Sequence, residues 1–166
     1  MLSCLATPDG FVTREMIDFY QAFARGGAAI VNIGDSAVDD EWGKGHFMQL
    51  SLGSDAVIGG LSTLVEALQK WGALASVEIN HTGMLGDPKV LGGDPIGPSS
   101  MDQGLIDRVV DNFASACERC LRAGLQMVTL HGGHGNLLSQ FASLRTNKRT
   151  DEYGGSLQNR ARFVIQ

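Results

Sequence analysis

The chain has 166 residues, of which 43% are hydrophobic, enough to bury the core of one ordinary domain. Its 13 basic and 18 acidic residues give a formal net charge of −5 without any basic run, which argues against nucleic-acid binding. The apolar stretches are shorter than a membrane span and the start, MLSCLATPDG, lacks the pattern of a signal peptide, so we expect a cytoplasmic protein with no membrane contact.

Three helix–strand pairs follow one another along the chain. Each expected helix repeats apolar residues at helical spacing, and each ends at a glycine. Ser54 is placed to cap the second helix. The expected helices cover residues 14–27, 54–72 and 102–124, and the strands that follow them cover 28–33, 73–79 and 125–130. Helices that alternate with short, nearly continuous apolar strands predict a parallel sheet buried on both faces.

The cysteines do not suggest a disulfide framework. There are three, an odd number, in a chain without a secretion signal. Cys117 and Cys120 lie on the apolar stripe of the third expected helix, and we interpret them as buried core thiols.

Each expected strand runs into a polar loop that contains glycine. These loops read GDSAVDDEWGKG, NHTGMLGDPKVLGGDPIGPSS and HGGHGNLL. Parallel α/β folds bind ligands at the carboxyl ends of their strands, so all three loops should border one site.

A doubly wound sheet and a TIM barrel both fit this alternation. The doubly wound alternative is weakened because no G-x-G-x-x-G lies between an early strand and its helix. A barrel needs eight strand–helix units, whereas this chain supplies three strands and the start of a fourth helix, SLQNRARFVIQ. We therefore expect an α/β fold that forms about the first half of a (β/α)8 barrel, as one domain over residues 1–166 that is truncated in its fourth helix.

The most distinctive stretch is TLHGGHGNLL, in which His131 and His134 stand among glycines. Taken alone, the two histidines fit a surface turn. They also fit a metal site, because His81 and Glu78 end a neighbouring expected strand and would complete the nitrogen and oxygen ligands of a Zn²⁺-dependent hydrolase barrel.

A longer stretch around these histidines, HGGHGNLLSQFASLRTNKRTDEYGGSLQNRARF, resembles the signature region of the Old Yellow Enzyme family. The segments PDGFVT, ARGGAAIV, NHTG and GPSS resemble other parts of that family, so the resemblance covers essentially the whole chain. It implies a flavin-dependent NADH:flavin oxidoreductase with FMN as cofactor and NADH or NADPH as reductant. The implied substrate is a small electron-poor alkene, such as an enone, and the fold is the front half of the family's barrel.

The resemblance also implies roles for individual residues. His131 and His134 would orient the substrate by donating hydrogen bonds to its carbonyl oxygen, where negative charge builds up as hydride arrives. Glu78 would meet the pyrimidine edge of the flavin, and Ala28 and Gly34, which flank the first strand, would lie near the flavin ring.

Several residues depart from the family pattern, among them Leu144 and Arg145 where the family has S-P-x. Asn136 stands where the family has the tyrosine that protonates the product, and an amide is not an acid near neutral pH. Glu78 replaces a glutamine, and we hypothesise that it is protonated when flavin is bound, or that it lowers the flavin's reduction potential. Met84 replaces an arginine.

The RTDEYGGS stretch is expected to brace its loop. Arg149 and Asp151 can pair across a tight turn, and Gly154 and Gly155 permit unusual backbone angles. Ser156 is placed to cap the helix that follows. Arg162 would make at most a peripheral contact.

The resemblance also implies missing parts. The family holds the FMN phosphate near its seventh and eighth strands, which this chain lacks, and longer relatives add an iron–sulfur cluster and a nucleotide-binding domain downstream. Half a barrel leaves sheet edges unpaired, so self-association or a missing barrel half is expected to cover them. A flavin-free, non-catalytic remnant is the remaining alternative.

Overall fold

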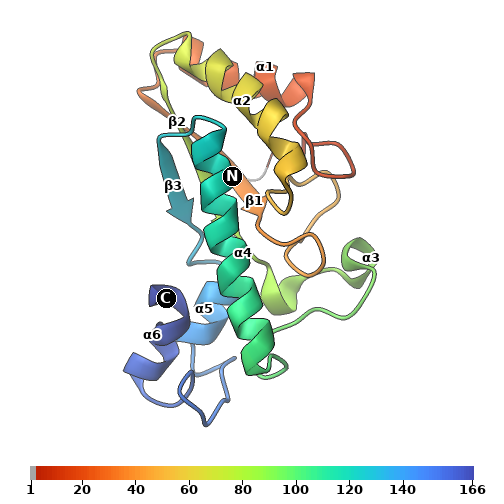
Figure 1. Ribbon diagram of the computed structural model, residues 1–166, viewed down its shortest axis with the longest axis vertical. Helices are drawn as coiled ribbons and strands as arrows, with labels where there is room; N and C mark the ends of the chain where they lie inside the picture. The colour runs from red at the N-terminus through yellow and green to blue at the C-terminus, as the bar shows by residue number, and fades with distance from the viewer. Residues whose placement is uncertain (1–2) are drawn as a thin grey trace.

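The computed structural model describes residues 3–166 (Figure 1). The helices are α1 (Arg14–Arg25), α2 (Ile58–Gln69), α3 (Pro88–Leu91), α4 (Gln103–Arg122), α5 (Leu137–Ala142) and α6 (Leu157–Ile165), with 3-10 turns at Asp55–Val57 and Gly83–Leu85. The strands are β1 (Ile30–Ala37), β2 (Leu74–Asn80) and β3 (Met127–Leu130).

The strands form one parallel sheet in the order β1-β2-β3, as the alternation predicted. β1 extends beyond its expected end at Ile33, because Ser36 and Ala37 continue the pairing with β2 after a local irregularity in register. This irregularity gives Asp35 a backbone φ of +43°, a region that residues other than glycine rarely occupy.

The starts of α1 and α4 agree with the sequence, whereas both ends of α2 differ from it. Thr13 caps α1 by accepting a hydrogen bond from Met16 N, and Asp102 caps α4 by accepting one from Leu105 N. The expected cap at Ser54 is wrong, since Ser54 precedes a 3-10 turn and its side chain makes no cap hydrogen bond. α2 also ends before Trp71, which is 47% exposed beneath the guanidinium of Arg25.

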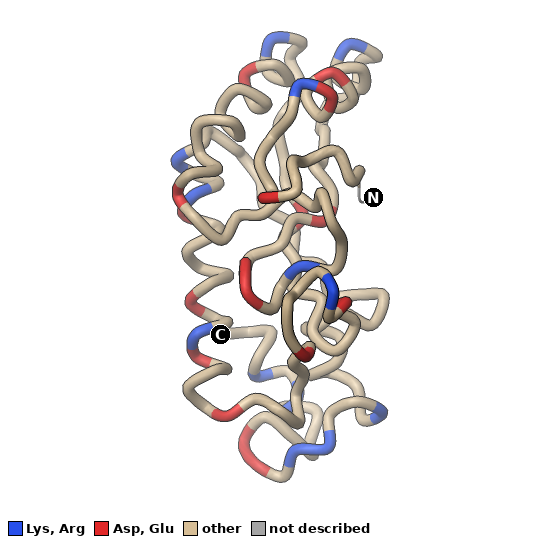
Figure 2. Tube along the Cα trace, turned by 90° about the vertical axis from the view of Figure 1, so that its right-hand side faces the viewer, with Lys and Arg blue, Asp and Glu red and all other residues tan. Residues whose placement is uncertain are grey.

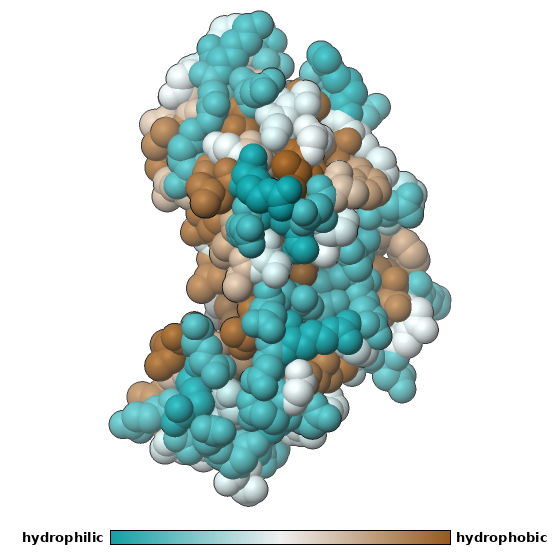
Figure 3. Space-filling view, in the orientation of Figure 1, coloured by the Kyte–Doolittle hydropathy of each residue, from teal (hydrophilic) through white to brown (hydrophobic). Residues whose placement is uncertain are grey.

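Only one face of the sheet is covered within residues 3–166. Helices α1, α2 and α4 pack on that face and form a first core with Ile33, Leu64, Val77 and Cys120. The prediction of a sheet buried on both faces is wrong for the described chain, because no described helix lies over the other face. The exposed apolar side chains on this open face are Ile30, Leu74 and Met127, whereas Val128 and Leu130 are exposed on the helix-covered face, beside Val77 and Ile79. Figure 3 shows mainly hydrophobic colour along the side where β3 lies.

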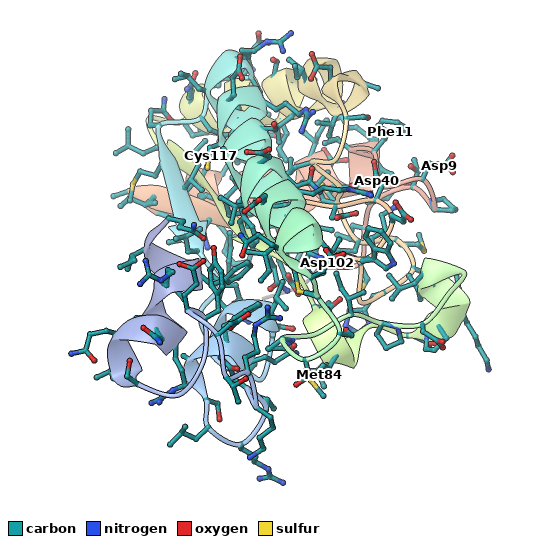
Figure 4. The ribbon with its side chains drawn as sticks, turned by 60° about the horizontal axis from the view of Figure 1, so that its bottom comes forward. Asp9, Phe11, Asp40, Met84, Asp102 and Cys117 are labelled. Carbon is teal, nitrogen blue, oxygen red and sulfur yellow. The ribbon has the colours of Figure 1, made fainter. Side chains whose placement is uncertain are left out.

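A second core joins the start of α4 to α5 and α6. Ile106 and Val109 of α4 pack there with Phe141, whose ring stacks on Phe163 at a centroid distance of 4.0 Å. α1 and α2 therefore lie together at one end of the molecule and α5 and α6 at the other, with α4 running between them (Figure 1). Figure 4 follows α4 from Asp102 to Cys117.

The expected core thiols and the expected brace are both present. Cys120 is fully buried and Cys117 is half-buried. Arg149 pairs with Asp151 and also donates to the carbonyl oxygens of Pro98 and Met101. Ser156 caps α6, and a Cβ at Gly154 would collide with the backbone carbonyl of Arg149.

Charged residues of both signs are mixed along the trace (Figure 2). Among the described helices, none is long and apolar enough to cross a bilayer.

Candidate functional site

A pocket of about 470 Å³ opens at the carboxyl ends of the strands. All three loops predicted to border one site contribute to it. Its lining residues are Asp35, Gly45, His46, Glu78, Thr82, Leu85, His131, His134 and Asn136. Parallel strands bring their carboxyl ends to one edge of the sheet, which explains why segments 100 residues apart in the chain meet here.

Glu78, His131 and His134 form a continuous chain of hydrogen bonds in this pocket. Oε1 of Glu78 lies 2.6 Å from Nδ1 of His131, and Nε2 of His131 lies 3.2 Å from Nδ1 of His134. The two imidazoles stack with a centroid distance of 5.1 Å and an angle of 29° between their planes. The register of the sheet creates the first contact, because Glu78 pairs with Thr129, two residues before His131.

The proton in the first hydrogen bond can be assigned. Burial raises the pKa of Glu78, but the hydrogen bond and charge of His131 outweigh burial and hold that pKa below its usual range. An ionised carboxylate only accepts hydrogen bonds, so Nδ1 of His131 donates. The hypothesis that Glu78 is protonated when flavin is bound stays a prediction. Without flavin, the lowered pKa of Glu78 favours the ionised carboxylate.

The loop that carries the histidines has a strained but well-anchored backbone. His134 has a φ of +54°, and the next residue, Gly135, has a φ of +83°. Gln140 anchors the loop through its Nε2, which donates to the carbonyl oxygens of Thr82 and Gly135. Positive φ at a residue with a side chain costs energy and is concentrated at functional sites, where surrounding contacts hold it in place.

Asn136 lies in the pocket wall and is 8% exposed. It precedes α5, but its side chain makes no cap hydrogen bond. Its backbone oxygen accepts from the backbone N–H of Gln140 and from Oγ of Ser139. The amide is therefore held at the pocket by its backbone, with its side chain not used as a helix cap.

His81 does not join the pair. Its side chain is fully buried, its Nδ1 accepts from the backbone N–H of Gly83, and its Nε2 has no partner in the described chain. Burial lowers its pKa to about 4 against the opposing charge of Asp39. The alternative metal-ligand set is not formed, because the buried ring of His81 accepts from the backbone N–H of Gly83, whereas Glu78 is hydrogen-bonded to His131. Within residues 3–166, no group of three His, Cys, Asp or Glu side chains has metal-binding geometry.

Three other residues considered from the sequence lie away from the pocket lining. Ala28 precedes β1, so the length of that strand, about 25 Å, separates it from the pocket. Gly34 is buried, and its N–H donates to the hydroxyl of Tyr20. Met84 is 50% exposed on the outer surface near Gly97 (Figure 4).

The sequence reading missed five lining residues: Asp35, Gly45, His46, Thr82 and Leu85. All five lie in, or one residue from, loops that were expected to border the site, and the strand-end rule was the signal that pointed to them. Leu85 belongs to a 3-10 turn within the second loop that was not predicted.

Comparison with known proteins identifies the family of this chain. A model of the NADH:flavin oxidoreductase / NADH oxidase family matches residues 1–166. The chain is 35% identical to a NADH oxidase of Thermoanaerobacter brockii over its whole length, which is 28% of that protein. It is 32% identical to a NADH:fumarate oxidoreductase of Klebsiella pneumoniae, with 99% of this chain and 19% of that protein covered.

Solved structures agree. The old yellow enzyme homologue from Zymomonas mobilis superposes with a TM-score of 0.91 at 26% identity, over 97% of this chain and 50% of that one. The expected fold, about half of a (β/α)8 barrel, is thereby confirmed. The chain spans half or less of the length of these relatives. Since the family model extends over every residue, the chain belongs to the NADH:flavin oxidoreductase / NADH oxidase family.

Proposed function

We propose that this chain forms part of the active site of an FMN-dependent oxidoreductase. In this proposal, hydride passes from NADH or NADPH through FMN to a small electron-poor alkene that carries a carbonyl or carboxylate group. The observation that carries the proposal is the pair His131 and His134, which lies at the carboxyl ends of the strands in a chain of this family. The Klebsiella pneumoniae relative is named for fumarate, an alkene of this chemical class.

The pocket residues fit the ring of a flavin. Glu78 has one oxygen bonded to His131 and a second oxygen that can accept from an N–H of the pyrimidine edge. A Cβ at Gly132 or Gly133 would meet no atom of the described chain within 4 Å, so open space lies beside that backbone. Glycine at both positions would let a planar ring approach the backbone closely.

The same pocket does not fit a phosphate. Its lining contains no lysine or arginine, and it includes two carboxylates, Asp35 and Glu78. We therefore assign to this chain the ring end of the FMN site and place the phosphate contacts elsewhere. FMN, when bound, supplies reversible hydride transfer.

The residues of the chain would act on the substrate in three ways. A histidine of the pair donates to the carbonyl oxygen and stabilises the negative charge that develops there. Asn136 can donate to or accept from the substrate, but it cannot supply a proton to carbon. Glu78 fixes the orientation of His131.

The first experiment is the visible absorption spectrum of the purified chain with and without added FMN. We expect a flavin band that stays with the protein and bleaches when NADH or NADPH is added without oxygen. Riboflavin is the matched control, and it should bind about as well as FMN because this pocket offers no phosphate contacts. A protein that binds neither flavin contradicts the proposal and leaves a non-catalytic remnant as the better description.

A further inference from the structure

The two histidines stand in series. Nε2 of His131 is hydrogen-bonded to Nδ1 of His134, so these two nitrogens face each other and not the open pocket. Nδ1 of His131 is hydrogen-bonded to Glu78. Within residues 3–166 this leaves Nε2 of His134 as the ring nitrogen of the pair without a protein partner, on an exposed side chain that lines the pocket. Two donors acting side by side on one oxygen are not what this geometry offers.

The positions of the protons follow from this order. Glu78 accepts, so His131 carries hydrogen on Nδ1 and, when neutral, has a lone pair on Nε2. That lone pair accepts from Nδ1–H of His134, and the outer nitrogen of His134 is then also a lone pair. One additional proton on the pair changes this. If His134 is the charged ring, both of its nitrogens carry hydrogen. If His131 is the charged ring, its Nε2–H donates to Nδ1 of His134, and the hydrogen of His134 is on Nε2. The pair can therefore donate to a ligand only when it holds that additional proton.

We propose that Glu78, His131 and His134 form a proton relay whose single outer donor, Nε2 of His134, protonates the oxygen of a carbonyl-bearing acceptor. The identity of the acceptor rests on the proposed function, whereas the relay itself does not. His134 is then the catalytic residue, and His131 and Glu78 are positioning residues that determine when it carries a proton.

The step balances with the hydride that the proposed NAD(P)H:flavin reaction supplies, the proton of His134 and water. Hydride adds to the β-carbon of the acceptor, and the electron pair of the alkene moves toward the carbonyl oxygen. The N–H bond of His134 breaks as an O–H bond forms, which gives an enol and returns the pair to its neutral state. Water then protonates the α-carbon as the enol loses its O–H proton, and solvent recharges the pair. This sequence needs no acid at position 136, where Asn136 stands.

Few other charges act on the relay. The titratable groups that share the pocket are Asp35 from the end of β1 and His46 from the loop that follows, in addition to the three members of the relay. No lysine or arginine lines the pocket.

The test is nitrogen-15 NMR of the histidine rings in the flavin-free chain, which reports which ring nitrogen carries hydrogen. In the neutral wild type we expect hydrogen on Nδ1 of both His131 and His134. In Glu78→Leu the acceptor is gone, so His131 should carry hydrogen on Nε2 and donate to His134. The proton of His134 should then move from Nδ1 to Nε2, although Glu78 does not touch that ring. Glu78→Ala provides a second variant, and amide spectra confirm that each variant is folded.

Asp35→Asn is the matched control, since it removes the other pocket carboxylate and should leave both rings as in the wild type. A wild type without hydrogen on both Nδ1 atoms, or a Glu78→Leu variant in which His134 does not change, overturns the relay. Failure to bind flavin overturns the proposed function and leaves this result unaffected.

A second measurement addresses oxygen protonation in the flavin-loaded protein. Reduction of 2-methylcyclohexenone should give 2-methylcyclohexanone with both configurations at the α-carbon, because water protonates the enol from either side. A single configuration at that carbon means that the α-proton arrives from one side within the site, and overturns protonation of the enol by bulk water.

Discussion

The stability of this protein should depend on one buried histidine. His81 has a pKa of about 4 in the folded chain, below the value of 6.5 that is normal for an imidazole. Between these two values the unfolded chain binds a proton on His81 and the folded chain does not. The free energy of unfolding is therefore highest above pH 6.5, where His81 is neutral in both states, and it decreases as the pH falls toward 4. Going from pH 7 to pH 5, the loss should be about 2 kcal/mol.

His81→Asn isolates this contribution, because the asparagine oxygen can accept from the backbone N–H of Gly83 in place of Nδ1. The assay is urea unfolding of both proteins at pH 7, 6 and 5. The free energy of unfolding should fall by about 2 kcal/mol more in the wild type than in the variant over this range. His46→Asn, at an exposed position, serves as the control and should follow the wild type. Equal pH dependence in wild type and His81→Asn would refute the reasoning.

Two further predictions concern the packing. Gly83→Ala should destabilise the chain by about 2–4 kcal/mol, because its φ is +61° and a Cβ there would lie 2.3 Å from Oε1 of Gln140. Gly59→Ala, on a helix position with no atom within 4 Å, should instead stabilise by up to about 1 kcal/mol, and urea unfolding that gives both changes the same sign would contradict this. A thiol reagent should modify exposed Cys4 in the native protein. It should reach Cys120 only after unfolding, because burial shields this thiol and raises its pKa to about 12. Fast labelling of Cys120 in the native protein would show that the first core is open.

Most of the regular structure could be predicted because it follows local patterns. α1 and α4 have side-chain caps and apolar stripes that act within one or two turns. α5 could not be predicted in this way, because it has six residues and no side-chain cap. Its stability comes from Leu137 and Phe141, which are fully buried against residues distant in the sequence.

The site likewise has features that local sequence patterns predict and features that depend on contacts distant in the sequence. The sequence indicated that three loops would meet and that His131 and His134 would lie together. It did not indicate the bond between His131 and Glu78, because that contact depends on which residue of β2 pairs with which residue of β3. A shift of one residue in that register would turn Glu78 to the other face of the sheet.

The shared use of α4 by both cores has a consequence for motion. Glu78 belongs to the first core through β2, whereas the histidine loop leads directly into the second core through α5. Phe113, near the middle of α4, packs against both cores, so separating them would break its packing. The amide hydrogens around Phe113 should therefore exchange with solvent as slowly as the most protected amides of the sheet. Their exchange rate measures how often the bond between Glu78 and His131 is broken by opening of the whole molecule.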